Sequence, residues 1–456
     1  MTAPHHHWAN DAIFYHIYPL GFSGAPYRND FASQPINRLQ KVADWLPHLR
    51  SLGANAIYLG PLFESSAHGY DTADYFTVDR RLGDHDSLKQ LSRSIHQAGM
   101  HLVLDAVFNH VGRDFWAFRD VQQNLASSPY CSWFAGLRFD VRSPKGDPFT
   151  YDTWNGHYDL VRLNLDNPAV RSHLFEAVRM WISEFEIDGL RLDAADCLSH
   201  DFMQALHSFC RQIKPDFWLM GEVIHGDYRK WANPSMLDSV TNYECYKGLY
   251  SSLADKNYFE IAYALNRQFG ADGIYRNLPL YNFVDNHDVD RVASKLVNPA
   301  HLFPLYLLLF TMPGIPSIYY GSEWGIQGVR TAVSDSALRP NLNLAEIENS
   351  SPHPSLTDVI ARLAALRVST PALCYGNYQQ VLVAPQQFAF IRQTSNQTIL
   401  VILNADEKEI PVSVPLGLPD GSAVDILNNS EGFSLKNGRL EIPNLPACWG
   451  RVLQLN

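Results

Sequence analysis

Three acidic residues stand at the ends of short apolar runs that are typical of buried strands. They are Asp193 in GLRLDAAD, Glu222 in LMGEV and Asp288 in NFVDNHD. In a barrel of parallel strands the carboxyl ends of the strands meet around one opening, so we expect these side chains to converge there. Cleavage of a glycosidic bond needs one carboxyl group as acid and another as nucleophile. The pattern therefore indicates an enzyme that acts on sugars.

The run GLRLDA shows how one strand would position two of these groups. Side chains alternate between the faces of a strand, so Leu190 and Leu192 share one face and Arg191 and Asp193 the other. We expect the leucines to pack against surrounding helices and the charged pair to face the barrel axis. A cation so close to a carboxylate predicts a lowered pKa for Asp193, and hence an ionised nucleophile.

Alternating strand and helix patterns up to about residue 370 predict a parallel α/β fold. Runs of strand character are found at 13–20, 54–60, 101–108, 188–194, 217–223, 239–245, 278–284 and 315–321. Eight strands is the number that closes a (β/α)₈ TIM barrel.

Two regions depart from this alternation. The stretch between Asn109 and Pro168 has no clear helix and is too long for a simple loop, which favours a small inserted domain over the barrel mouth. After residue 372, short alternating runs split by turn residues predict a C-terminal antiparallel β-sandwich. The expected division is barrel 1–110 and 161–371, inserted domain 111–160 and sandwich 372–456.

Composition excludes several classes of protein. The 456 residues carry a formal net charge of −11, which argues against a nucleic-acid partner. No apolar run is long enough to cross a membrane, and the start of the chain lacks a secretory signal, so the expected location is the cytoplasm. The 6 cysteines form no CxxC pair and are expected to be reduced thiols.

A cluster after the third predicted strand admits two interpretations. Asp105, Asn109 and His110 could belong to a metal site, because oxygen-rich loops of this kind can hold a structural calcium ion. The same side chains equally suit hydrogen bonds to loop backbone and substrate. We favour the second interpretation and expect no metal or cofactor.

Four ordered segments carry a resemblance to a known family. DAVFNH (105–110), GLRLDAAD (189–196), MGEV (220–223) and FVDNHD (283–288) resemble the four signature regions of the α-amylase family of glycoside hydrolases. The resemblance implies that Asp193 is the nucleophile, Glu222 the general acid/base and Asp288 the transition-state stabiliser. It also implies cleavage with retention through a glycosyl-enzyme intermediate, with carboxyl groups about 5–5.5 Å apart.

The resemblance also assigns substrate-binding side chains. Those around the sugar at the cleaved bond would be His68, Tyr70, His110, Arg191 and His287. Arg191 would order the nucleophile, and Tyr70 would be a stacking platform. Asp335 and Arg339 would hold the next sugar outward. The implied partner is a small oligosaccharide, bound by a monomer or a homodimer.

HYDLVRLNLDNP and GEVIHGDY are most similar to the branch of cyclomaltodextrinases, neopullulanases and maltogenic amylases. This implies hydrolysis of α-1,4 bonds, with α-1,6 bonds as a further option, in malto-oligosaccharides or cyclic maltodextrins. Two features depart from the branch. The first barrel strand begins near residue 13, where the branch carries an extra N-terminal domain. Asp196 and Cys197 replace a common Lys-His pair, which weakens the expectation of an inter-domain calcium.

Other functions remain open at this stage. A transglycosylase, an isomerase or a phosphorylase would use the same three carboxyl groups, and sequence does not reveal how a site admits water. A non-catalytic sugar-binding protein is disfavoured because Asp193, Glu222 and Asp288 are all present.

Overall fold

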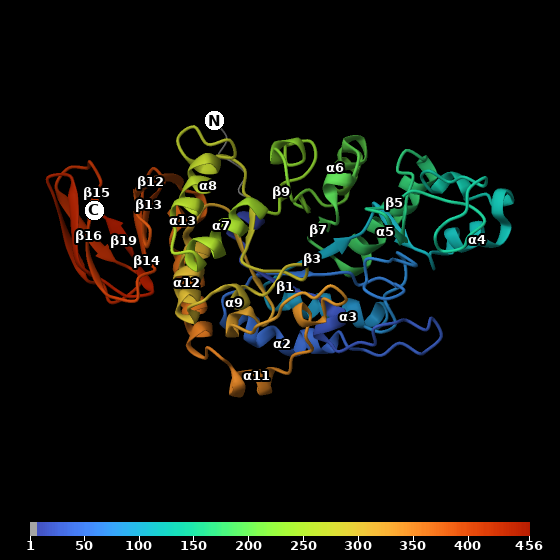
Figure 1. Ribbon diagram of the computed structural model, residues 1–456, viewed down its shortest axis with the longest axis horizontal. Helices are drawn as coiled ribbons and strands as arrows, with labels where there is room; N and C mark the ends of the chain where they lie inside the picture. Colours follow the sequence, from blue (N-terminus) through green and yellow to red (C-terminus); the bar gives the residue numbers. More distant parts are fainter. Residues whose placement is uncertain (1–6) are drawn as a thin grey trace.

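A barrel of parallel strands forms the centre of the molecule, with a small inserted segment at one end and a β-rich C-terminal part at the other (Figure 1). This computed structural model describes residues 7–456. The first six residues lie outside it, and they belong to the N-terminal segment in which the sequence predicts no secretory signal. The barrel strands are β1 (Phe14–Ile17), β2 (Ala56–Leu59), β3 (His101–Ala106), β7 (Gly189–Leu192), β8 (Trp218–Gly221), β9 (Ser239–Val240), β10 (Tyr281–Phe283) and β11 (Ile315–Tyr319).

The strand order is β10-β11-β1-β2-β3-β7-β8-β9, and a parallel bridge between Thr241 and Tyr281 joins its two ends. The closed parallel barrel and the antiparallel C-terminal strands confirm the predicted fold class. All eight predicted runs contain a barrel strand. The run 239–245 was predicted too long, because Asn242 accepts a hydrogen bond from the backbone N–H of Cys245 and starts a helix at Tyr243.

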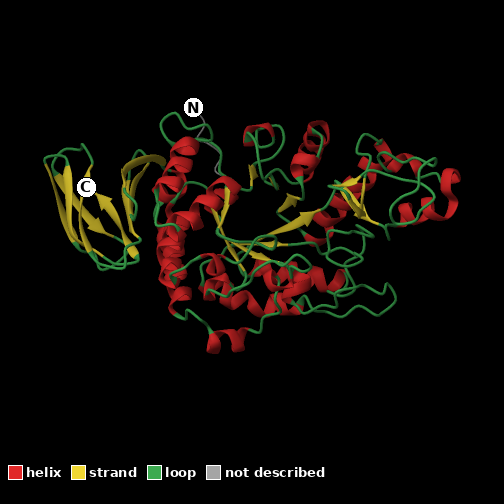
Figure 2. Ribbon diagram, in the orientation of Figure 1, coloured by secondary structure: helices red, strands yellow, loops and turns green. Residues whose placement is uncertain are grey.

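Most of the helices surround the barrel, and α4 lies in the inserted segment (Figure 1 and Figure 2). Their bounds are α1 (Pro19–Phe22), α2 (Gln40–Ser51), α3 (His85–Gln97), α4 (Trp116–Asn124), α5 (Pro168–Phe185), α6 (His200–Ile213), α7 (Tyr243–Ala254), α8 (Phe259–Phe269), α9 (Val292–Lys295), α10 (Leu302–Thr311), α11 (Leu344–Ser350), α12 (Ser355–Ser369) and α13 (Pro371–Tyr375). Helix α5 begins at a local signal: Asn167 accepts the N–H of Ala169 at 2.9 Å, and Pro168 occupies the first turn.

The barrel strands pack on both faces. Leu190 and Leu192 are fully buried in the outer core between strands and helices, as alternation predicts, and Arg191 faces inward. Aromatic rings fill the axis below the site: Phe14 lies 5.1 Å from Trp218 and 5.4 Å from Tyr281, measured between ring centroids. This plug closes the barrel and leaves the polar residues at its carboxyl end.

The inserted segment contains helix α4 and a small antiparallel sheet in the order β4-β6-β5. Its strands are β4 (His110–Gly112), β5 (Thr153–Trp154) and β6 (His157–Arg162). His110 pairs with Arg162 across this sheet, only a few residues after β3 ends. The segment is therefore anchored at the rim of the barrel.

The C-terminal strands form one antiparallel sheet in the order β12-β13-β14-β19-β16-β17-β18-β15. Their bounds are β12 (Asn377–Val383), β13 (Gln387–Gln393), β14 (Thr398–Asn404), β15 (Ile410–Pro415), β16 (Gly421–Asp425), β17 (Gly432–Lys436), β18 (Arg439–Leu445) and β19 (Trp449–Leu455). Leu400 of β14 and Ile442 of β18 share the core that the sheet encloses, whereas Phe390 and Val401 pack toward the barrel. Because side chains of β14 alternate between its two faces, this strand contributes both to the core of the C-terminal sheet and to the contact with the barrel.

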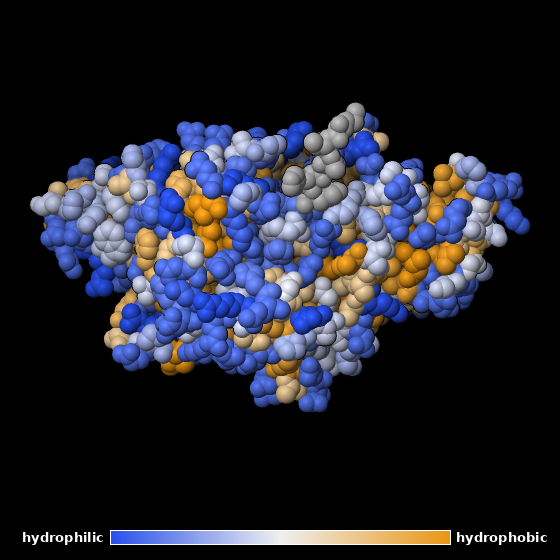
Figure 3. All heavy atoms as spheres, turned by 180° about the vertical axis from the view of Figure 1, so that it is seen from behind, coloured by the Kyte–Doolittle hydropathy of each residue, from blue (hydrophilic) through white to orange (hydrophobic). Residues whose placement is uncertain are grey.

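The rear surface is mainly hydrophilic, with separate small apolar patches (Figure 3). Within residues 7–456, none of the helices is both long and apolar enough to cross a membrane.

All six cysteines are free thiols. The four-part division of the chain given above stays a prediction.

Candidate active site

Arg191 is the centre of the cluster at the carboxyl end of the barrel. Its Nη1 donates to Asp105 at 2.9 and 3.1 Å and to Asp193 Oδ1 at 2.9 Å. Its Nη2 lies 2.9 Å from Glu222 Oε2. The arginine is only 3% exposed. One buried guanidinium therefore links carboxyl groups from β3, β7 and β8, which fixes their relative positions.

Asp193 follows β7 and is buried, with its backbone N–H bonded to the carbonyl of Ala106 on β3. Burial raises the pKa of Asp193 well above its ordinary value; the charge of Arg191 opposes this, and the carboxyl groups of Glu222 and Asp105 add to it. The sequence-based expectation of a lowered pKa is therefore wrong. Proximity to a cation was predicted correctly, but the loss of hydration and the neighbouring carboxylates outweigh it.

Glu222 follows Gly221, where a side chain would meet Leu237 at 2.5 Å. Its Oε2 accepts hydrogen bonds from Arg191 and, at 3.2 Å, from the backbone N–H of Ala194. Ala194 has a φ of 44°, in the left-handed region. This strained backbone aims the N–H at Glu222, so one carboxyl oxygen is held from two sides.

Asp288 lies in the loop after β10 with both oxygens engaged. Oδ2 is 3.0 Å from His287 Nε2, and Oδ1 accepts from Arg339 Nη2 at 3.0 Å. Burial alone would raise the pKa of Asp288, but His287 and Arg339 hold it well below the ordinary range. Asp288 is therefore ionised at neutral pH.

Predicted sugar-binding side chains gather around these carboxyl groups. Tyr70 stacks on His287 at 5.3 Å, and its hydroxyl bonds to His287 Nε2 and to Asp105 at 3.0 Å. His110 Nε2 lies 3.9 Å from Asp193 Oδ2 and has no other polar partner in the described chain. Burial lowers the pKa of His110 to about 3, so the ring is neutral.

His68 and the predicted outer pair, Asp335 and Arg339, lie at the same site. His68 precedes Tyr70 closely and remains partly exposed, its Nδ1 3.3 Å from the backbone N–H of Tyr70. Asp335 and Arg339 form an ion pair at 2.8 Å. Arg339 also contacts Asp288 directly, so this pair borders the carboxyl cluster. The roles of all these residues toward a sugar stay predictions.

Several contacting residues were not identified from the sequence, namely His16, Tyr18, Tyr58 and Tyr243. Tyr58 donates to Asp105 at 2.6 Å, and His16 stacks on Tyr58 at 4.2 Å. Both stand at inward positions of predicted strands, so alternation could have found them. Tyr243 gave no such signal, because the sequence placed it in a strand rather than at the start of α7.

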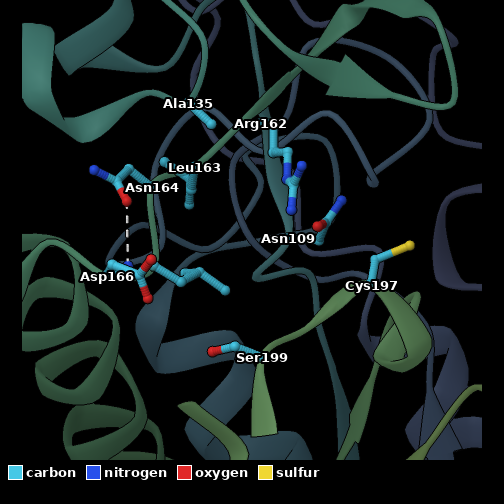
Figure 4. Close-up of a pocket in the computed structure, with 9 residues that line it drawn as sticks. Asn109, Ala135, Arg162, Leu163, Asn164, Asp166, Cys197 and Ser199 are labelled. Carbon is cyan, nitrogen blue, oxygen red and sulfur yellow. Dashed lines mark hydrogen bonds between the residues drawn. The ribbon is translucent and has the colours of Figure 1, made fainter. Parts of the chain in front are cut away.

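Of the residues of the alternative calcium site, Asp105 bonds to Arg191 and His110 lies near Asp193. Asn109 lines a separate cavity of about 180 Å³ beside the inserted segment (Figure 4). It is lined by Asn109, Arg162, Asn164, Asp166, Cys197 and Ser199, among others. Calcium needs 6–8 oxygen ligands, usually including several carboxylates. Here the side chain of Arg162 points into the cavity, and the one lining carboxyl group, on Asp166, is 88% exposed. This donor set does not fit calcium, and no metal-ligand cluster occurs among residues 7–456.

The chain matches the model of a known protein family. The model for "Alpha amylase, catalytic domain" matches residues 16–357. The chain belongs to the α-amylase family. The predicted family and the predicted glycoside hydrolase class are both confirmed.

Named relatives place the chain near one branch of this family. A cyclomaltodextrinase of Bacillus sp is 33% identical over 421 residues, covering 88% of this chain and 74% of the relative. An intracellular maltogenic amylase of Bacillus subtilis is 32% identical over 341 residues, covering 70% of this chain and 56% of the relative. Among solved structures, a cyclic α-maltosyl-(1→6)-maltose hydrolase of Arthrobacter globiformis superposes with a TM-score of 0.82 at 29% identity, covering 100% of both chains.

Proposed function

We propose that this α-amylase family hydrolase cleaves α-glucosidic bonds of short or cyclic malto-oligosaccharides with retention of configuration. The observation that carries the proposal is the shared guanidinium of Arg191, which contacts Asp193 and Glu222 at 2.9 Å each. Two carboxyl groups held by one guanidinium are close neighbours. Retaining enzymes need a separation of about 5–5.5 Å, whereas inverting enzymes need roughly 6.5–9.5 Å to admit a water.

In each of the two carboxyl groups, Asp193 and Glu222, hydrogen bonds to Arg191 occupy one oxygen and leave the other to react. Asp193 Oδ1 is engaged by Arg191, which leaves Oδ2, on the side of His110, to attack the anomeric carbon. Glu222 Oε2 is engaged by Arg191 and Ala194, which leaves Oε1 to protonate the departing oxygen. A water deprotonated by Glu222 would then hydrolyse the glycosyl-enzyme intermediate.

The remaining groups support the charge that develops on the sugar. Ionised Asp288 would stabilise the oxocarbenium-like transition state, and neutral His110 would bind a sugar hydroxyl. Within residues 7–456, Arg191 is the one arginine or lysine that pairs with Asp105, Asp193 and Glu222. Burial is the main cause of the raised pKa of Asp193, and the neighbouring carboxyl groups add to it. The proposed mechanism requires the carboxylate form of Asp193 and a proton on Glu222, and the charge of Arg191 favours that carboxylate.

The substrate class and the location rest on the relatives. Their names describe action on cyclic maltodextrins and on a small cyclic tetrasaccharide, and one is called intracellular. We therefore propose a small oligosaccharide substrate in the cytoplasm.

The proposal is tested with equal masses of cyclomaltodextrin, maltotriose, pullulan, soluble starch and cyclic maltosyl-(1→6)-maltose. Initial rates are compared by product chromatography, and proton NMR identifies the first anomer formed. We expect α-anomers and faster cleavage of the small substrates. A first product of β configuration would refute retention, and preference for starch would refute the substrate class. Added glucose or phosphate shows whether transfer competes with hydrolysis.

A further inference from the structure

Tyr243, the first residue of α7, contacts the oxygen that would carry the catalytic proton. Its hydroxyl donates to Glu222 Oε1 at 3.4 Å and accepts from Asn286 Nδ2 at 3.2 Å. Oε1 has no other hydrogen-bond partner in the described chain besides this hydroxyl. We propose that Tyr243 and Asn286 are positioning residues that aim Glu222 Oε1 at the leaving oxygen. The inference rests on the proposed hydrolysis.

Asn286, Tyr243 and Glu222 form a chain of hydrogen bonds, called the relay below, and backbone N–H groups fix the direction in which its hydrogens point. Asn286 Oδ1 accepts the N–H groups of Asp288 at 2.8 Å and Val289 at 3.2 Å. The amide nitrogen of Asn286 must therefore face Tyr243. Because the Tyr243 oxygen receives that hydrogen, its own hydrogen points to Glu222. The relay thus couples the loop of the stabilising carboxylate to the acid–base group.

The hydroxyl is held in place and stays protonated. The ring of Tyr243 packs edge-on against Phe283, with centroids 5.0 Å apart. Burial raises the pKa of Tyr243 well above its ordinary value, and the carboxyl groups of Glu222 and Asp288 add to this effect. A permanent donor favours the carboxylate that Glu222 becomes after it gives up its proton. Such bonds are often long in the free enzyme and shorten when substrate binds.

The relay should matter only when the leaving group needs protonation. Tyr243→Phe keeps the ring and removes the hydroxyl. We expect kcat/KM for maltotriose to fall about 10- to 100-fold, a part of what general acid catalysis supplies. kcat/KM for α-maltosyl fluoride, whose fluoride leaves without a proton, should change less than about threefold, since this constant stops at formation of the intermediate.

Tyr246→Phe is the matched control, because Tyr246 lies on the same helix with its ring stacked on Phe283 at 5.2 Å. Tyr246→Phe should leave kcat/KM unchanged for both substrates. Comparing two substrates on one preparation makes the ratio independent of the folded fraction. Equal losses on both substrates, or no loss on either, would overturn the inference. Failure of the unaltered enzyme to cleave either substrate would instead overturn the proposed function, and the inference with it.

Discussion

Replacing Arg191 by Met should impair the ionisation of Asp193, the proposed nucleophile, more than it changes the shape of the site. Met has similar length but no charge. The change leaves Asp105, Asp193 and Glu222 facing one another in a buried site without the cation that contacts all three. Removing one partner of a buried ion pair costs about 3–5 kcal/mol. The unfolding entropy of a chain of this size is about 1 kcal/mol per degree, so we expect the midpoint of thermal unfolding to fall by on the order of 3–5 °C.

The pKa of Asp193 gives the sign of the pH effect. It is already raised in the native protein, and Arg191 is the charge that opposes the rise. Losing a nearby cation should raise it by a further 1–3 units or so. Since attack needs the ionised form, the acidic limb of kcat/KM should move to higher pH by about the same amount.

The thermal stability of Arg191→Met should also depend on pH, in the direction that a raised pKa of Asp193 predicts. A carboxyl group with a raised folded pKa favours the fold below its unfolded pKa and loses that contribution as pH rises through the folded value. The loss of thermal stability in Arg191→Met should therefore be smaller at pH 5 than at pH 8.

The assay is a pH profile of kcat/KM on maltotriose, with thermal melts at both pH values. Arg191→Lys keeps a point charge without the planar fork, so its acidic limb should move less. Arg439→Met is the control, because the pair of Arg439 with Glu441 is exposed and contributes about 0–1 kcal/mol. An Arg191→Met enzyme with an unmoved acidic limb would refute the reasoning, whatever its stability.

Three further outcomes are expected. Asp193→Ala should lower kcat more than about a thousandfold without lowering the melting temperature; near-normal activity would exclude it as nucleophile. Dialysis against EDTA should leave the melting temperature unchanged, because Asp105 is bonded to Arg191 and the side chain of Arg162 points into the cavity lined by Asn109; a loss reversed by Ca²⁺ would contradict this. Arg392→Met should cost about 1–3 kcal/mol, since buried Arg392 donates to the carbonyls of Thr311 at 2.7 Å and Gly376 at 3.0 Å. Its activity per folded molecule should stay unchanged, and unfolding and rate measurements check both.

Features that depend on near neighbours in the chain could be predicted from the sequence. Alternation placed Leu190 and Arg191 on opposite faces, and the stretch without a clear helix was predicted to end at Pro168, where α5 begins. All eight barrel strands were found, because a buried strand between helices needs a continuous apolar run. The three carboxyl residues followed from their places at strand ends.

Only the tertiary structure decided how these groups act on one another. Arg339 reaches Asp288 across 51 positions of sequence, and Tyr243 reaches Glu222 because Asn242 starts a helix where a strand was predicted. The pKa of Asp193 moved opposite to the expectation from its neighbour Arg191. The sequence displays which charges exist, but burial and the convergence of distant carboxyl groups set the free energy of ionisation, and both arise only when the barrel closes.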